Sequence, residues 1–158
     1  MIKQKDKVSI SGKYRFKIWD AKTGKLIRTT QWNKNLIVVN ENSGLNIAVK
    51  NLLGNFTYNL EITKAKMGTG TATPNSNDTD LKNPVVDNIA LANKNENSTS
   101  EVFLEFFISD AECPNGTYYE FGIFCGNRLF ARSLISPALT KSTGQDITAE
   151  YTINFYNT

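Results

Sequence analysis

The chain has 158 residues with 18 basic and 15 acidic side chains, and its net charge of +3 is too small to indicate nucleic acid or an acidic membrane as a partner. It contains no histidine, so it lacks the commonest metal ligand and the base of Ser–His and Cys–His nucleophile systems. A chain of this length, with 40% hydrophobic residues, can bury a core without disulfides or metals, and we expect one domain over residues 1–158.

Three lysines stand in the first seven residues, ahead of any strand pattern: Lys3, Lys5 and Lys7. The chain opens without the apolar segment of a signal peptide, and no stretch approaches the ~18 apolar residues of a membrane span, so we expect no membrane partner. We expect residues 1–7 to form a short arm with no core of its own, either solvated or in contact with a partner subunit.

Apolar and basic side chains alternate from Lys13 to Trp19, which predicts a half-buried strand. A turn around Gly24 follows, and the segment from Leu26 to Trp32 is predicted to be the return strand of a hairpin. Trp19 and Trp32 lie on the two arms. We expect them to pack across the strands, with a sugar-stacking platform as the alternative.

The apolar spacing changes to three and four residues between Asn40 and Gly54, which predicts a helix from Leu45 to Leu53. Gly54 supplies a left-handed residue that ends it. We expect its apolar stripe to face the core, with Val49 at the centre of the buried face. The alternative is that this stripe binds a partner. The stripe consists of Leu45, Ala48, Val49, Leu52 and Leu53.

The middle of the chain combines strands with long polar loops. We expect a strand from Tyr58 to Met67, a surface loop to Leu81, a short strand from Pro84 to Ala92 and a polar turn over Asn93–Ser100. The loops at 71–80 and 93–100 have too few apolar residues to fold on themselves, and contacts between subunits can order them.

Two motifs in the first of these loops suggest ligands but lack essential parts. Gly68-Thr69-Gly70 lacks the third glycine of a dinucleotide motif and the Gly-Lys-Ser/Thr of a phosphate loop, so it predicts a structural turn. The Asx-rich segment after it lacks the glycine and the distal glutamate of an EF-hand. We therefore predict no metal and no cofactor, and we expect no small-molecule ligand. The Asx residues are Asn75, Asn77, Asp78 and Asp80.

The last third of the chain consists of strand patterns. Val102–Ile108 is apolar except for Glu105, as expected of a strand covered on both faces. Short strands around one helix predict a mainly β fold, an antiparallel β-sandwich with one packed α-helix. The other strands are expected at Tyr118–Phe124, Arg128–Leu134 and Asp146–Tyr156.

The remaining reactive residues do not indicate an enzyme. Cys113 and Cys125 are too sparse for a disulfide framework, and we expect buried free thiols. Exposed strand and turn positions account for the carboxylates, since no pair of them is placed in a pocket. The carboxylates weighed are Glu101, Glu105, Asp110, Glu112 and Glu120.

Several phrases occur in an order that resembles structural proteins of tailed bacteriophages, from about Asn35 to the end. A Gly-Thr-Gly-rich segment with a proline (67–74) precedes Asn77-Asp78-Thr79-Asp80-Leu81. Glu-Phe-Gly-Ile-Phe (120–124) and Leu-Phe-Ala-Arg-Ser (129–133) follow, then a Ser-Pro, Lys141 and the alternating strand from Ile147 to Phe155.

The resemblance implies a virion structural role in the tail, baseplate or tail fibre, without catalytic residues. The partners would be other virion proteins and copies of this chain, and the protein would be made in the host cytoplasm. The chain lacks the extended shaft and receptor-binding tip of longer fibre proteins, which favours an adaptor, collar or decoration subunit. The alternatives are a carbohydrate-binding or host-adhesion module and a capsid decoration or head-fibre protein.

We expect the contacts to come from the arm and the first long loop, because polar loops between rigid strands are where such scaffolds place them. The candidate interaction residues are Lys3, Lys5, Lys7, Thr71, Pro74, Asn75, Asp78 and Asp80.

Overall fold

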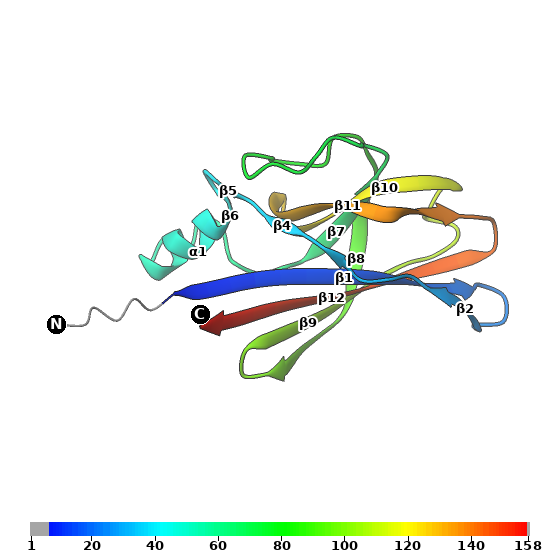
Figure 1. Ribbon diagram of the computed structural model, residues 1–158, viewed down its shortest axis with the longest axis horizontal. Coiled ribbons are helices and arrows are strands. Elements are labelled where there is room, and N and C mark those ends of the chain that lie inside the picture. The colour runs from blue at the N-terminus through cyan, green and yellow to red at the C-terminus, as the bar shows by residue number, and fades with distance from the viewer. Residues whose placement is uncertain (1–6, 158) are drawn as a thin grey trace.

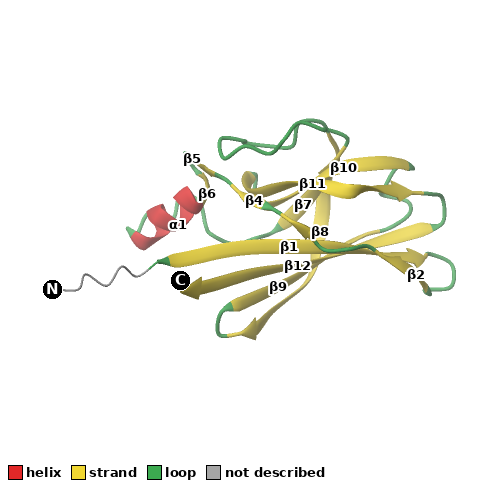
Figure 2. Ribbon diagram, in the orientation of Figure 1, coloured by secondary structure: helices red, strands yellow, loops and turns green. Residues whose placement is uncertain are grey.

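The computed structural model describes residues 7–157. Of the described residues, 60% are in strands and 5% are in the helix. The prediction of a mainly β, antiparallel fold with one helix is confirmed (Figures 1 and 2). The elements are β1 (Val8–Asp20), β2 (Leu26–Thr29), β3 (Asn33–Lys34), β4 (Leu36–Ile37), β5 (Val39–Asn40), β6 (Ser43–Gly44), α1 (Leu45–Leu52), β7 (Lys64–Gly68), β8 (Pro84–Ser98), β9 (Glu101–Ile108), β10 (Gly116–Cys125), β11 (Arg128–Lys141) and β12 (Gln145–Asn157).

Ten of these strands form one curled antiparallel sheet in the order β2-β1-β12-β9-β8-β7-β10-β11-β4, with β3 beside β1. The segment that contains β3 and β4 bridges the two margins of the sheet, since β3 pairs with β1 and β4 pairs with β11. Figure 1 shows the result as a half-barrel in which β1, β12 and β9 face β7, β10 and β11. The apolar faces of these strands meet inside the curl.

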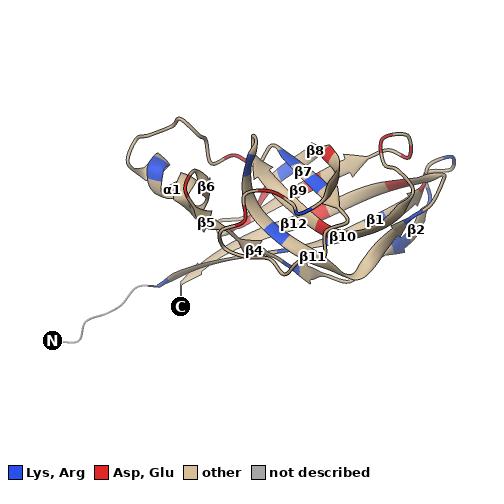
Figure 3. Cartoon of the chain, turned by 90° about the horizontal axis from the view of Figure 1, so that it is seen from above, with Lys and Arg blue, Asp and Glu red and all other residues tan. Residues whose placement is uncertain are grey.

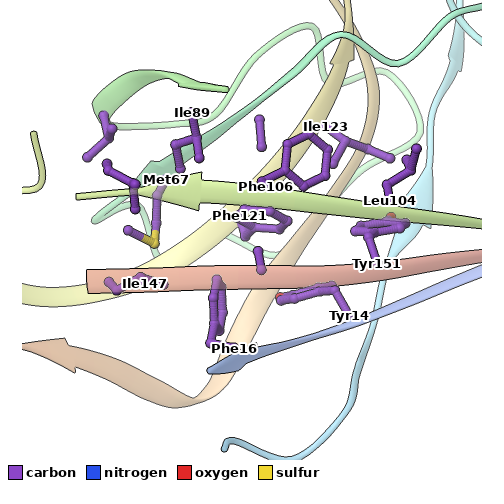
Figure 4. Close-up of a cluster of buried hydrophobic side chains, with 14 of the residues drawn as sticks. Tyr14, Phe16, Met67, Ile89, Leu104, Phe106, Phe121, Ile123, Ile147 and Tyr151 are labelled. Carbon is purple, nitrogen blue, oxygen red and sulfur yellow. The ribbon is translucent and has the colours of Figure 1, made fainter. Parts of the chain in front are cut away.

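The core is aromatic at its centre (Figure 4). The predicted strand from Lys13 to Trp19 is confirmed and lies within β1, which pairs along its whole length with β12. The inward side chains Tyr14 and Phe16 contact Phe121 of β10, with ring centroids 4.9 and 5.3 Å apart. Such rings bury a large apolar area, so this cluster joins the two halves of the curl.

The helix forms where it was predicted, but its apolar stripe is not in the core. Ile47 is fully buried, whereas Val49, Leu52 and Leu53 are 53%, 88% and 81% exposed. Gly44 places the helix start against the Val38 carbonyl, where a Cβ atom would overlap it, so α1 docks by its first turn at the end of the sheet. Its last turn extends past the strands, and the prediction that Val49 is a core residue is wrong.

The two predicted boundaries in the middle of the chain also differ from the structure. β8 continues to Ser98, so the expected turn over 93–100 is a strand with only a tight turn before β9. Backbone hydrogen bonds to β9 keep this exposed polar part of β8 in a strand, because strand pairing does not require apolar side chains. Conversely, residues 58–63 are irregular, and the strand expected from Tyr58 starts only at Lys64.

The predicted C-terminal strands are confirmed, each as part of a longer strand of the sheet. The predicted return strand of the first hairpin is shorter than expected and ends at Thr29. β9 is not covered on both faces as expected, because Phe107 is 42% exposed. The other face of β9 carries Leu104, Phe106 and Ile108 into the core.

Candidate protein interface

A buried ion network joins the first long loop to the sheet. The Arg132 guanidinium of β11 lies 2.8 Å from a Glu120 carboxylate oxygen of β10 and 3.1 Å from an Asp78 carboxylate oxygen of the loop. The Glu120 and Arg132 side chains have no exposed area and that of Asp78 is 3% exposed. The expectation that Glu120 occupies an exposed position is therefore wrong, because a fixed guanidinium compensates its buried charge.

Hydrogen bonds from the backbone complete this network and order the loop within the chain. The Glu120 carboxylate accepts bonds from the amides of Gly70, Lys82 and Asn83 at 2.7 to 3.0 Å. Arg132 donates to the Ala72 carbonyl at 2.8 Å. Burial raises the pKa of Glu120, but these amide bonds and the guanidinium outweigh it and hold the pKa below its usual range.

The Gly-Thr-Gly segment serves the same network. A Cβ atom at Gly68 would overlap the Asn83 carbonyl, and one at Gly70 would overlap the Glu120 carboxylate. The glycines therefore allow a close approach of the backbone, and the Gly70 amide that a phosphate would need is bonded to Glu120. Four segments of the sequence resemblance thus meet in one buried cluster, namely 67–74, 77–81, 120–124 and 129–133.

The predicted interaction residues of the loop fall into two groups. Thr71 and Asn75 are exposed and Pro74 is half-buried, so they are accessible, and a partner contact there stays a prediction. Asp78 is turned inward, bonded to Arg132 and to Lys82 at 2.6 Å, and Asp80 bonds Lys66 at 3.0 Å. Lysine and arginine thus occupy both carboxylates that a calcium ion would use.

The arm is described only at its last residue. Lys7 is exposed, while Lys3 and Lys5 lie outside the described residues.

In residues 7–157 no group of three or more potential metal-ligating side chains lies close together.

The tryptophans do not pack on each other as expected. The ring of Trp32, which is 39% exposed, lies under the cationic groups of Lys13 and Arg15, at 4.8 and 4.6 Å from its centroid. The Trp19 indole donates to the Thr148 hydroxyl at 3.0 Å. Cations on the basic face of β1 therefore cover the ring that a sugar would need, an arrangement that stabilises the ring in place.

The two cysteines are free and buried, as predicted. Burial raises the pKa of Cys125 to about 11, so its thiol stays protonated and unreactive at neutral pH.

Exposed apolar side chains gather at one end of the molecule, where Figure 1 shows α1, the start of β1 and the end of β12. We call this the apolar end; it consists of Val49, Leu52, Leu53, Phe56, Leu60 and Phe155, which are 40% to 88% exposed. Asn51 links the helix to the following segment through bonds to Tyr58 and Leu60. Figure 3 shows that α1 has almost no charge, Lys50 being its one charged residue.

A cleft of about 610 Å³ opens at the same end, between residues 60–62 and the hairpin of β8 and β9. Its floor is apolar, formed by Leu104, Phe130 and Ile153, and Leu60 and Phe155 lie at its rim. The polar part of the rim holds the carboxylates of Glu61 and Glu96 with one lysine, Lys94. An apolar floor with charged groups at its edge is typical of a binding site.

The sequence predicted that the helical stripe faces the core, because its spacing is that of a buried helix face. The alternative, that the stripe binds a partner, is the one compatible with its exposure.

No family model, no curated protein and no solved structure matches this chain. What the geometry defines is a class of fold, a curled antiparallel β half-barrel with one helix at its end. Among residues 7–157, no helix has the length and hydropathy needed to cross a membrane.

Proposed function

We propose that this chain is a structural subunit of a bacteriophage particle and acts by protein–protein assembly rather than by catalysis. Two independent features support the proposal. The ordered phrases between Asn35 and Phe155 resemble those of tailed-phage structural proteins. The apolar end offers a surface for contacts with other subunits.

The single observation that carries the assembly role is the exposure of large apolar side chains in the last turn of α1 and the residues directly after it. Leu52 is 88% exposed, Leu53 is 81% exposed and Phe56 is 62% exposed. Covering such a side chain gains about 1.5–3 kcal/mol. Apolar residues that are exposed together mark an interaction surface, whereas single exposed apolar residues do not. A partner that covers the apolar end therefore gains a substantial part of a binding free energy.

The proposed place in the particle is that of an adaptor, collar or decoration subunit, of which several copies are present. The described residues form one curled sheet with a helix at its end, so surface contacts of this unit would connect it to its neighbours. Repeated copies then require a surface patch that is reused by symmetry.

The test is a pair of matched double variants compared in solution and in particles. Leu52→Asp with Leu53→Asp places two charges on the apolar end. Leu26→Asp with Ile27→Asp does the same on β2 at the opposite end, where the side chains are 48% and 49% exposed. Sedimentation velocity reports self-association, and quantitative mass spectrometry of purified particles reports copy number.

We expect the first pair to abolish incorporation into particles while the second pair leaves it near the wild-type level. Equal incorporation of both pairs would refute the role of the apolar end. Absence of the wild-type chain from purified particles would refute the virion function itself.

A further inference from the structure

The cleft beside the apolar end has an apolar floor and an acidic rim. We propose that it receives residues 1–6 of a neighbouring copy of this chain, so that copies are linked arm to cleft. This inference rests on the proposed assembly function and names the partner segment.

The size and lining of the cleft fit a short peptide segment. Its volume of about 610 Å³ is that of a site for a group of several side chains. Leu104, Phe130 and Ile153 at the floor are almost fully buried, so they form a fixed surface. The arm begins with Met1 and Ile2, whose side chains can cover this floor.

The charges of the cleft and of the arm are complementary. Glu61 is bonded to Lys94 at 3.1 Å. Glu96 lies opposite Val102, on the same face of the hairpin as the floor residue Leu104, and its side chain is exposed with no bonded partner among the described residues. Two carboxylates therefore stand beside one lysine at this rim.

Residues 1–6 of the arm supply the opposite sign. Their charged side chains are Lys3, Lys5 and Asp6, a net positive set that directly follows the two apolar residues. Ion pairs at such a rim contribute more to orientation and partner choice than to affinity, whereas the apolar floor supplies the binding free energy.

The direction of β1 favours the cleft of another copy over the chain's own. Ile10 lies opposite Phe155, which lines the cleft, and β1 passes this rim outward until Val8 lies opposite Asn157. To enter its own cleft the chain would have to reverse immediately before Val8, yet residues 1–7 contain no glycine or proline, and Asp6 is the one residue there of a type common in turns. Six extended residues reach about 20 Å, enough to enter an adjacent subunit. Such a head-to-tail contact builds rings or linear arrays.

The first test traps the contact in the full-length chain. Ile2→Cys is combined with Leu60→Cys at the cleft rim, and the matched control combines Ile2→Cys with Ile27→Cys at the far end. The two native cysteines are buried and stay unreactive under native conditions. After mild oxidation we expect disulfide-linked multimers on a non-reducing gel for the Leu60 pair and at least tenfold fewer for the control. A monomer with an internal disulfide would overturn the contact between copies, and equal yields in both pairs would overturn the cleft as the site.

The second test exchanges the charges. Glu61→Lys with Glu96→Lys, or Lys3→Glu with Lys5→Glu, should each weaken self-association about tenfold at low salt. Mixing the two variants should restore association, because each arm then finds a cleft of opposite sign. Failure of mixing to restore it would overturn the inference. If neither the traps nor the charge variants have an effect but the chain is still incorporated into particles through Leu52 and Leu53, the arm contact alone fails and the proposed function stands.

Discussion

The middle and the end of this protein depart from the usual distribution of side chains in opposite ways. Between β10, β11 and the first long loop, Glu120, Arg132 and Asp78 bury three charges. At the end of the sheet, Leu52 and Leu53 place apolar side chains in solvent. Each departure costs free energy in the isolated chain, but only the first is compensated within it, by ion pairs and backbone bonds.

This difference suggests that the buried network stabilises the fold, whereas the apolar end is available for contacts with a partner. The buried network holds a glycine-rich loop against the sheet, and its bonds all end inside the chain. Among residues 7–157 the apolar end has no such internal compensation, and under the proposed function a partner would supply it. The predictions below test this separation by asking which region controls stability and which one does not.

The largest effect is expected from removing the buried guanidinium. Arg132→Met leaves Glu120 and Asp78 buried without their shared partner, which should cost about 3–5 kcal/mol and lower the melting temperature by about 10 °C. Thermal unfolding followed by circular dichroism measures this shift. The control Arg28→Met removes an exposed arginine and should stay within about 2 °C. Equal shifts for the two variants would contradict the network's role.

A smaller effect is expected at the single buried position of the helix. Ile47→Ala should cost about 2–4 kcal/mol because Ile47 is fully buried and its removal leaves a cavity. Val49→Ala, on the exposed face, should change stability by about 0.5 kcal/mol or less. Urea unfolding of both variants measures the difference. If Val49→Ala were the more costly of the two, the helix would not dock as described.

The network should also give the protein a specific loss of stability in acid. The pKa values of Glu120 and Asp78 lie below their ordinary range in the folded state, so both carboxylates bind protons more readily when the chain unfolds. Their stabilising effect is therefore complete above the unfolded pKa of about 4 and is lost as pH falls below it. We expect a melting temperature that is steady from pH 7 to about pH 5.5 and falls steeply below about pH 4.

Glu120→Gln sharpens this test, because it removes one of the titrating groups. The variant should be less stable at pH 7 but lose less stability between pH 5 and pH 3 than the wild-type chain. Glu96→Gln, at an exposed position, is the control and should keep the wild-type slope. An unchanged slope in Glu120→Gln would show that other groups cause the acid loss.

The smallest effect on stability is expected at the apolar end. Leu52→Asp with Leu53→Asp should shift the melting temperature of the monomer by about 2 °C or less, since both side chains are already in solvent. Differential scanning calorimetry at low concentration measures this. A drop as large as that of Arg132→Met would mean that these leucines belong to the core and not to an interface.

Local patterns predicted much of the fold. The alternation in residues 13–19 and 147–155 identified the strands that became β1 and β12, because period two determines which side chains share a face. The helical spacing placed α1 within one residue, and Gly54 follows it at a φ of 77°. The second half of β8 was not predicted, because residues 93–98 do not alternate between apolar and polar. They form a strand because they pair with β9, not because of their own composition.

The candidate sites divide in the same way. Sequence alone determined the faces of β1 and β12, the helix position and the glycine-rich turn, since these depend on neighbours in the chain. Tertiary structure decided that Glu120 meets Arg132 and Asp78, because those residues are 12 and 42 positions away and only the pairing of β10 with β11 and the course of the loop join them. It also decided that the helical stripe faces solvent. Periodicity states that residues share a face, but what covers that face depends on where the helix docks, and Gly44 docks it at the open end of the sheet.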